Sequence, residues 1–102
     1  MEKSTAHYPL HEIKALVKKG GVYPTQTALR DAAFLDYKLD DMIYVVENLE
    51  DGDLYKSMTA DFDNTLWQDV YHYPAAEAVI YLKLQIQGNG SLKCVIISFK
   101  EK

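Results

Sequence analysis

The chain of 102 residues contains a single cysteine, Cys94, and no long apolar segment. With no second cysteine and no histidine near it in the sequence, Cys94 cannot form an internal disulfide or a cysteine-rich metal site. Its apolar neighbours predict a buried, unreactive thiol. No apolar run approaches the roughly 20 residues that span a bilayer, and the opening residues 1–5 lead into no signal region. We therefore expect a soluble, cytoplasmic protein that does not enter the membrane.

Positive charge is also scarce. The chain has 15 acidic and 11 basic residues and a net charge of −4, the opposite of a protein that binds nucleic acid through its overall charge. A small catalytic site can still bind one or two phosphates, because only the local charge matters there. The acidic residues gather between Asp40 and Asp53, whereas isolated lysines follow in the second half: Lys56, Lys83, Lys93, Lys100 and Lys102.

Three helical patterns fill the first half of the chain. Apolar residues at helical spacing predict a helix over residues 9–19, and Thr25 is the predicted N-cap of a second helix. Asp40 is the predicted N-cap of a third. Residues 1–7 are predicted to be irregular, and residues 22–23 are long enough only for an edge strand or a connector.

After the acidic loop that ends at Asp53, the apolar period changes from 3.6 to 2, which marks β-strands. Helices followed by strands predict one α+β domain over residues 1–102, with three N-terminal helices packed on a C-terminal antiparallel sheet. The predicted strands are residues 54–59, 67–71, 78–87 and 91–100.

The dipeptide Asn89-Gly90 predicts a two-residue hairpin turn between the last two strands. In that register, Tyr81 and Lys100 become diagonal neighbours on the polar face. A slip of one residue would turn Lys100 to the core face and separate it from Tyr81. The register is favoured because it unites three apolar pairs on the other face: Leu84 with Val95, Leu82 with Ile97, and Ile80 with Phe99.

Polar residues of four predicted strands can meet on one face of the sheet: Lys56, Gln68, Tyr81 and Lys100. RNA cleavage without a metal needs a base for the 2′-hydroxyl, an acid for the leaving 5′-oxygen and cations for the charged phosphorane. Tyr81 can exchange protons, both lysines can bind phosphate, and Gln68 can hold a phosphate or sugar oxygen. Taken singly, each has a plainer reading, as a solubilising lysine, a packing tyrosine or a surface amide.

Several segments carry a resemblance that runs nearly end to end: Met1-Glu2-Lys3, His7, Asp53-Leu54-Tyr55-Lys56-Ser57-Met58-Thr59, Trp67-Gln68-Asp69-Val70-Tyr71, Val79-Ile80-Tyr81-Leu82-Lys83 and Ile97-Ser98-Phe99-Lys100-Glu101-Lys102. In order and spacing they resemble the MqsR toxin family. The resemblance implies a fold related to RelE-type bacterial endoribonucleases. It also implies a ribosome-independent, metal-independent mRNA interferase that cuts at GC-containing triplets such as GCU. The family's active-site residues fall on Lys56, Gln68, Tyr81 and Lys100.

The resemblance also implies a cognate antitoxin, MqsA, which binds zinc in its own N-terminal domain and DNA through its C-terminal domain. The toxin itself would need no cofactor, and its substrate would be single-stranded mRNA. This chain departs from the family in its acidic net charge and in its connector, where His72-Tyr73-Pro74 and Glu77 stand in place of the usual arginines. That departure predicts weaker non-specific affinity for RNA.

Three further residues are weaker candidates for RNA contact: His7, Tyr55 and Lys83. An exposed ring beside Lys56 can stack on a base, and His7 is carried by the family. The spacing of His7 and His11 would also permit a metal pair, but two solvated histidines are the favoured reading without a third ligand. The competing function is a protein-binding module without catalysis, which engages an antitoxin or a transcription regulator. An assay of RNA cleavage separates the two.

Overall fold

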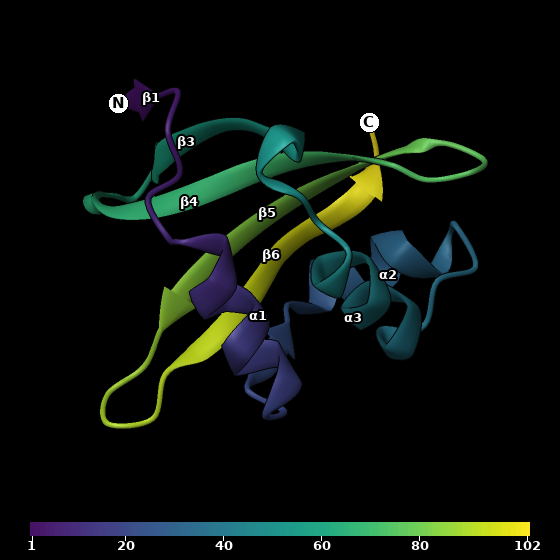
Figure 1. Cartoon of the computed structure of the whole chain (residues 1–102), viewed down its shortest axis with the longest axis horizontal. Coiled ribbons are helices and arrows are strands. Elements are labelled where there is room, and N and C mark those ends of the chain that lie inside the picture. The colour runs from purple at the N-terminus through teal and green to yellow at the C-terminus, as the bar shows by residue number, and fades with distance from the viewer.

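Three helices cover one face of a six-stranded sheet in the computed structural model, which describes all of residues 1–102 (Figure 1). The helices are α1 (Leu10–Lys18), α2 (Gln26–Ala33) and α3 (Leu39–Glu47), and a short 3₁₀ turn, η1 (Asp51–Asp53), follows them. The strands are β1 (Glu2–Lys3), β2 (Val22–Pro24), β3 (Leu54–Ala60), β4 (Asp63–Pro74), β5 (Val79–Gln87) and β6 (Lys93–Glu101).

The order of strands in the sheet is β1-β3-β4-β5-β6-β2, so both outer strands come from the N-terminal half of the chain. Strand β1 pairs antiparallel with β3, whereas β2 pairs parallel with β6. The α+β class stands, but the predicted arrangement of three N-terminal helices on a C-terminal antiparallel sheet is wrong. Strands precede and separate the helices, and one pair is parallel. Strands β1 and β2, of two and three residues, are too short to carry a periodic signal. Their places in the sheet come from their pairing with the longer strands β3 and β6.

Local sequence explains where the helices begin. The hydroxyl of Thr25 accepts a hydrogen bond from the Ala28 N–H at 3.0 Å, which confirms Thr25 as the N-cap of α2. The predicted cap of the third helix is wrong, because α3 begins after Lys38 and the Asp41 carboxylate accepts the Lys38 N–H at 2.8 Å. No helix is long and apolar enough to cross a membrane.

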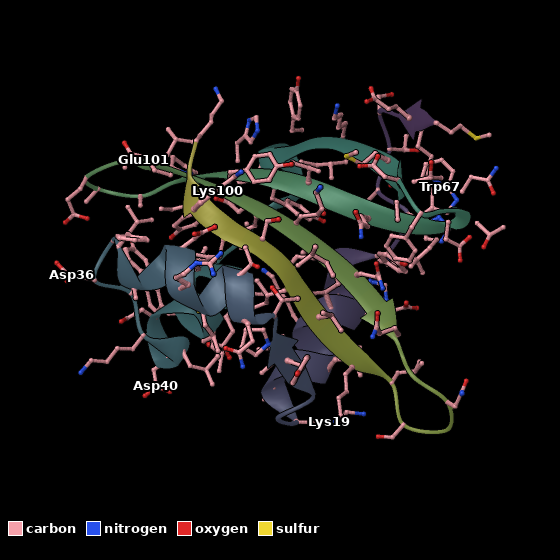
Figure 2. The ribbon with its side chains drawn as sticks, turned by 180° about the vertical axis from the view of Figure 1, so that it is seen from behind. Lys19, Asp36, Asp40, Trp67, Lys100 and Glu101 are labelled. Carbon is pink, nitrogen blue, oxygen red and sulfur yellow. The ribbon has the colours of Figure 1, made fainter.

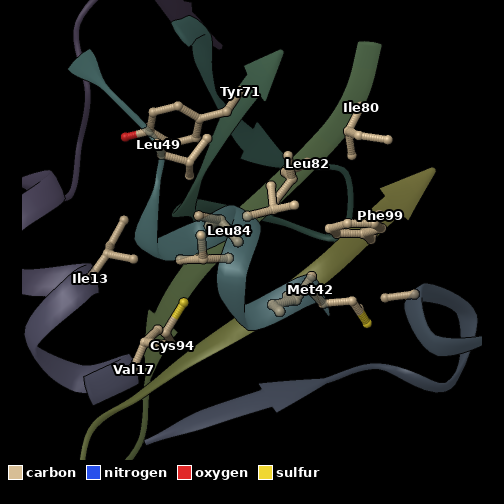
Figure 3. Close-up of a cluster of buried hydrophobic side chains, with 14 of the residues drawn as sticks. Ile13, Val17, Met42, Leu49, Tyr71, Ile80, Leu82, Leu84, Cys94 and Phe99 are labelled. Carbon is tan, nitrogen blue, oxygen red and sulfur yellow. The ribbon is translucent and has the colours of Figure 1, made fainter. Parts of the chain in front are cut away.

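Apolar side chains from the helices and the sheet meet in one core (Figure 3). Cys94 is fully buried in it, and this burial raises the pKa of its thiol to about 12, in agreement with the predicted unreactive cysteine. The largest fully buried members of the core include Ile13 of α1, Met42 of α3, and Tyr71, Leu82, Leu84 and Phe99 of the sheet.

The hairpin between β5 and β6 has a longer loop than predicted. Residues 88–92 lie between the two strands, and Gly88 and Gly90 adopt positive φ angles of 132° and 81° that suit glycine. The predicted pairs are wrong, because Leu84 lies opposite Ile96, Leu82 opposite Phe99 and Tyr81 directly opposite Lys100.

A buried carboxylate fixes the N-terminal segment to the sheet. Asp69 of β4 is fully buried and accepts hydrogen bonds from the His7 N–H at 3.0 and 3.1 Å, the Tyr8 N–H at 2.9 Å and the Ser57 hydroxyl at 2.5 Å. These bonds offset the cost of burying the charge. They also tie residues 7–8 to the middle of the sheet, which holds β1 beside β3.

Candidate active site

The candidate catalytic residues lie on the face of the sheet that the helices leave uncovered, where Figure 2 labels Lys100. The side chains of this face form cross-strand rows. In one row, which we call the tyrosine row, His72 of β4 lies opposite Tyr81 of β5, and Tyr81 lies opposite Lys100 of β6. The Lys100 Nζ lies 5.4 Å from the centre of the Tyr81 ring. On the other side, the Tyr55 ring stacks on His72 with centroids 4.4 Å apart.

The adjacent row, which we call the lysine row, supplies two more cations. Lys56 of β3 lies opposite Val70, and Val70 lies opposite Lys83 of β5. Strand alternation puts this row on the same face as Tyr81, two residues further along β5. The structure therefore brings together Lys56, Tyr81 and Lys100 from the predicted set, with Lys83 between the other two lysines.

Gln68 lies on the same face of the sheet but is not beside Tyr81. It is four residues from His72 along β4, a separation of about 13 Å in a strand. Its side chain is 6% exposed and donates to the Gln85 carbonyl oxygen at 3.0 Å, and Gln85 in turn donates to Gln87. Gln68 is therefore held in place by Gln85, away from the tyrosine row.

Two β-bulges bring the candidate catalytic side chains to this face. Ile97 is an extra residue in β6, between the pairs Lys83–Ser98 and Leu84–Ile96, and it restores Lys100 to the face of Tyr81 despite the shifted hairpin register. The Thr25 hydroxyl donates to the Ile97 carbonyl at 3.0 Å and so gives the carbonyl of the bulged residue a hydrogen-bond partner. In β3, a register shift leaves Tyr55 as the extra residue before Lys56.

Two groups of the site hold their protons more tightly than usual. Burial raises the pKa of Tyr81, although the nearby positive charge of Lys56 acts in the opposite direction. The hydrogen bond from Lys56 Nζ to the Glu2 carboxylate, 2.7 Å long, raises the pKa of Lys56. At neutral pH Tyr81 is therefore a proton donor and Lys56 a cation.

Two other groups lose their protons more readily. Burial lowers the pKa of Lys83, the negative charge of Asp61 acts in the opposite direction, and the positive charges of Lys100 and Lys56 lower the pKa further. Burial also lowers the pKa of His72, with a smaller contribution from Lys102. His72 is therefore a neutral imidazole at pH 7, able to accept a proton beside Tyr81.

His7 lies away from these residues, on the face of the sheet that the helices cover. Its ring stacks on Trp67 at a centroid distance of 5.5 Å, and its Nδ1 is 3.1 Å from the Lys3 Nζ. In Figure 2, Trp67 lies on the right of the view and Lys100 on the left. The structure thus separates His7 from Tyr55 and Lys83, the other two weaker candidates, which both border the site.

Sequence reasoning did not assign a role to His72 or to Glu2. The signal for His72 was present, because alternation along β4 puts Gln68, Val70 and His72 on one face. No comparable signal existed for Glu2, whose strand is only two residues long.

The site face is open rather than enclosed. None of the four main clefts includes Lys56, Tyr81 or Lys100, and the largest lies across α3 and the β4–β5 connector, lined in part by Tyr37, Tyr44 and Glu77. No group of three histidine, cysteine or acidic side chains lies close enough to bind a metal ion. An open face of this kind suits an extended polymer better than a small molecule.

Known proteins resemble the chain over its whole length. Residues 5–101 match the family described as motility quorum-sensing regulator, toxin of MqsA. The chain is also 41% identical over 102 residues to the mRNA interferase toxin MqsR of Escherichia coli (strain K12), and the alignment covers 100% of both sequences. Both matches include the two rows that hold Lys56, Tyr81 and Lys100. This chain belongs to the MqsR toxin family.

Proposed function

We propose that this chain is the toxin of a toxin–antitoxin pair and acts as an mRNA interferase, an endoribonuclease that arrests translation by cutting mRNA. The observation that carries the proposal is the direct pairing of Tyr81 with Lys100 on an open sheet face, with Lys56 in the next row. Family membership and the name of the E. coli relative support the same reading. A proton donor between cations is the arrangement that phosphodiester cleavage needs.

The reaction we propose is attack by the 2′-oxygen of RNA on the adjacent phosphorus. A base takes the 2′-hydroxyl proton, the new P–O2′ bond forms, and the P–O5′ bond breaks. Tyr81 gives its proton to the departing 5′-oxygen, since its raised pKa keeps it protonated at neutral pH. The products are a 2′,3′-cyclic phosphate and a 5′-hydroxyl.

The surrounding residues would bind the substrate. Lys56 and Lys100 stabilise the charge on the phosphorane, and Lys83 adds a third cation between them. Gln68, held in place by Gln85, contacts a nucleotide next to the scissile one. Tyr55 is 56% exposed and can stack on a base.

We further propose that cleavage occurs at GC-containing triplets such as GCU and needs neither a ribosome nor a metal ion. The test is incubation of the purified protein with a GCU-containing RNA in EDTA, beside an RNA in which the triplet is scrambled. We expect cleavage of the first RNA within the triplet. Cleavage only after addition of Mg²⁺, or no cleavage at all in the presence of a folded protein, would contradict the proposal and favour a binding-only module.

The proposed partner is an MqsA-like antitoxin in the cytoplasm. The description of the matched family names the toxin of MqsA. Zinc in this pair would belong to the antitoxin, and contact with DNA would be indirect, through that partner. Co-expression with the neighbouring gene's product should relieve growth arrest, whereas arrest that persists in a verified complex would contradict this assignment.

Replacing Lys83 with alanine is expected to weaken RNA binding and to reduce the salt dependence of the binding constant by about one unit of slope. The reason is the loss of one phosphate contact. The measurement is a titration over several KCl concentrations with RNA that carries a single 2′-deoxy nucleotide at the cut position. Lys93→Ala, which removes an exposed lysine at the far end of β6, is the matched control. Equal slopes for the two variants would remove Lys83 from the site.

A further inference from the structure

Strand β1 brings a carboxylate to the candidate active site. The Glu2 Oε2 lies 2.7 Å from the Lys56 Nζ, and both belong to the uncovered face of the sheet. Glu2 lies opposite Met58 in the β1–β3 pair, so strand alternation directs it to the face of Lys56, while Lys3 points to the other face. This ion pair spans 54 positions of sequence and exists only because β1 joins the sheet.

We propose that Glu2 is a positioning residue for Lys56, which it holds beside Tyr81 as a fixed cation. The proposal rests on the proposed function, because Lys56 is assigned there to the phosphorane. Lys56 carries a long, flexible side chain that would otherwise sample many rotamers in the free enzyme. One hydrogen bond to Glu2 uses one of its three donors and leaves two for the substrate.

An ordinary surface ion pair would contribute little, because two mobile side chains must both be ordered to form it. Here the strand that carries Glu2 is anchored on both sides. The carbonyl of Met1 accepts the Thr59 N–H at 3.0 Å, and the Lys3 Nζ lies 4.3 Å from the centre of the Trp67 ring. Further along, the Asp69 carboxylate holds the backbone of residues 7–8. The Lys56 side chain is 29% exposed and the Glu2 side chain 58% exposed, so water reaches the pair mainly from the side of Glu2, and the anchored strand rather than burial keeps the two groups together.

Other charged and titratable groups that face Lys56 cannot replace Glu2. The neighbours on β3, β4 and β5 are Tyr55, His72, Tyr81 and Lys83. None of them is an anion at neutral pH, so Glu2 is the one negative charge that acts directly on the Lys56 ammonium.

The test compares Glu2→Gln with the wild-type protein in two measurements. The first is single-turnover cleavage of the GCU-containing RNA at pH 7.5, where we expect a fall of about threefold to fivefold in rate. The second is an NMR titration of the Lys56 side chain in the protein alone, where we expect a lower pKa because the carboxylate that raises it is gone. Glu2→Asp should restore part of both effects.

Glu47→Gln is the control, because it makes the same change at an exposed carboxylate of α3, in the layer of helices on the far side of the sheet. It should leave the cleavage rate and the Lys56 titration unchanged. An unchanged rate or an unchanged Lys56 pKa in Glu2→Gln would overturn the proposal. So would faster cleavage by Glu2→Gln, because Glu2 would then compete with phosphate. Absence of cleavage by the wild-type protein would instead contradict the proposed function, which keeps the two failures apart.

Discussion

Replacing Tyr81 with phenylalanine is expected to lower the rate of RNA cleavage by about 100-fold or more, the usual contribution of a positioned proton donor. The change removes only the hydroxyl group, and the ring keeps its contacts with His72 and Lys100. Because the cations stay in place, RNA affinity should change little. Cleavage under single-turnover conditions and binding of the deoxy-blocked RNA measure the two effects separately.

The control for this variant is Tyr44→Phe. Tyr44 is 61% exposed on α3, in the layer of helices on the far side of the sheet. Loss of the Tyr44 hydroxyl should leave both the rate of RNA cleavage and the RNA affinity unchanged. If Tyr81→Phe kept wild-type activity, the proton donor would have to be another residue and the assignment of the site would fail.

Replacing Asp69 with alanine is expected to lower the free energy of unfolding by about 3 to 5 kcal/mol, because each buried donor that loses its acceptor costs about 1 to 3 kcal/mol. The change leaves the Ser57 hydroxyl and the backbone N–H groups of His7 and Tyr8 without their acceptor. For a chain of this size the melting temperature should fall by about 10 °C or more. Thermal and urea unfolding followed by circular dichroism provide the measurement.

Asp63→Ala is the matched control for Asp69→Ala. Asp63 also lies in β4, but its carboxylate bonds only to the Thr65 N–H and hydroxyl at the exposed start of the strand. Its loss should cost much less stability. If the two variants unfolded alike, the buried network around Asp69 would not be what fixes the N-terminal segment to the sheet.

The periodic parts of the fold could be predicted from the sequence, whereas the parts that depend on long-range pairing could not. Helical spacing and the Thr25 cap are local signals, and both are borne out by α1 and α2. The two short edge strands carry too few residues for a pattern, and their place in the sheet depends on β3 and β6. The hairpin register was wrong for a related reason, because a five-residue loop and the bulge at Ile97 each shift the pairing.

The candidate site illustrates the same division. Strand alternation predicted correctly that Lys56, Tyr81 and Lys100 share a face, although the register behind the Tyr81–Lys100 contact was incorrect. The five-residue loop and the bulge at Ile97 were both missed, but their effects on Lys100 cancel. The loop alone would turn Lys100 to the core face, and the bulge turns it back to the outer face. Glu2 could not be placed at the site in advance, because its position follows from the anchoring of β1 through Asp69.

The chemistry of the cut ends tests the central claim most directly. A GCU-containing RNA is cleaved in EDTA, and the ends are mapped by mass spectrometry beside an RNA with one 2′-deoxy nucleotide at the cut position. Attack by the 2′-oxygen, with Tyr81 as proton donor, predicts a 2′,3′-cyclic phosphate and a 5′-hydroxyl from the first RNA and no cleavage of the second. A 5′-phosphate product, or cleavage of the deoxy-blocked RNA at that position, would contradict the mechanism.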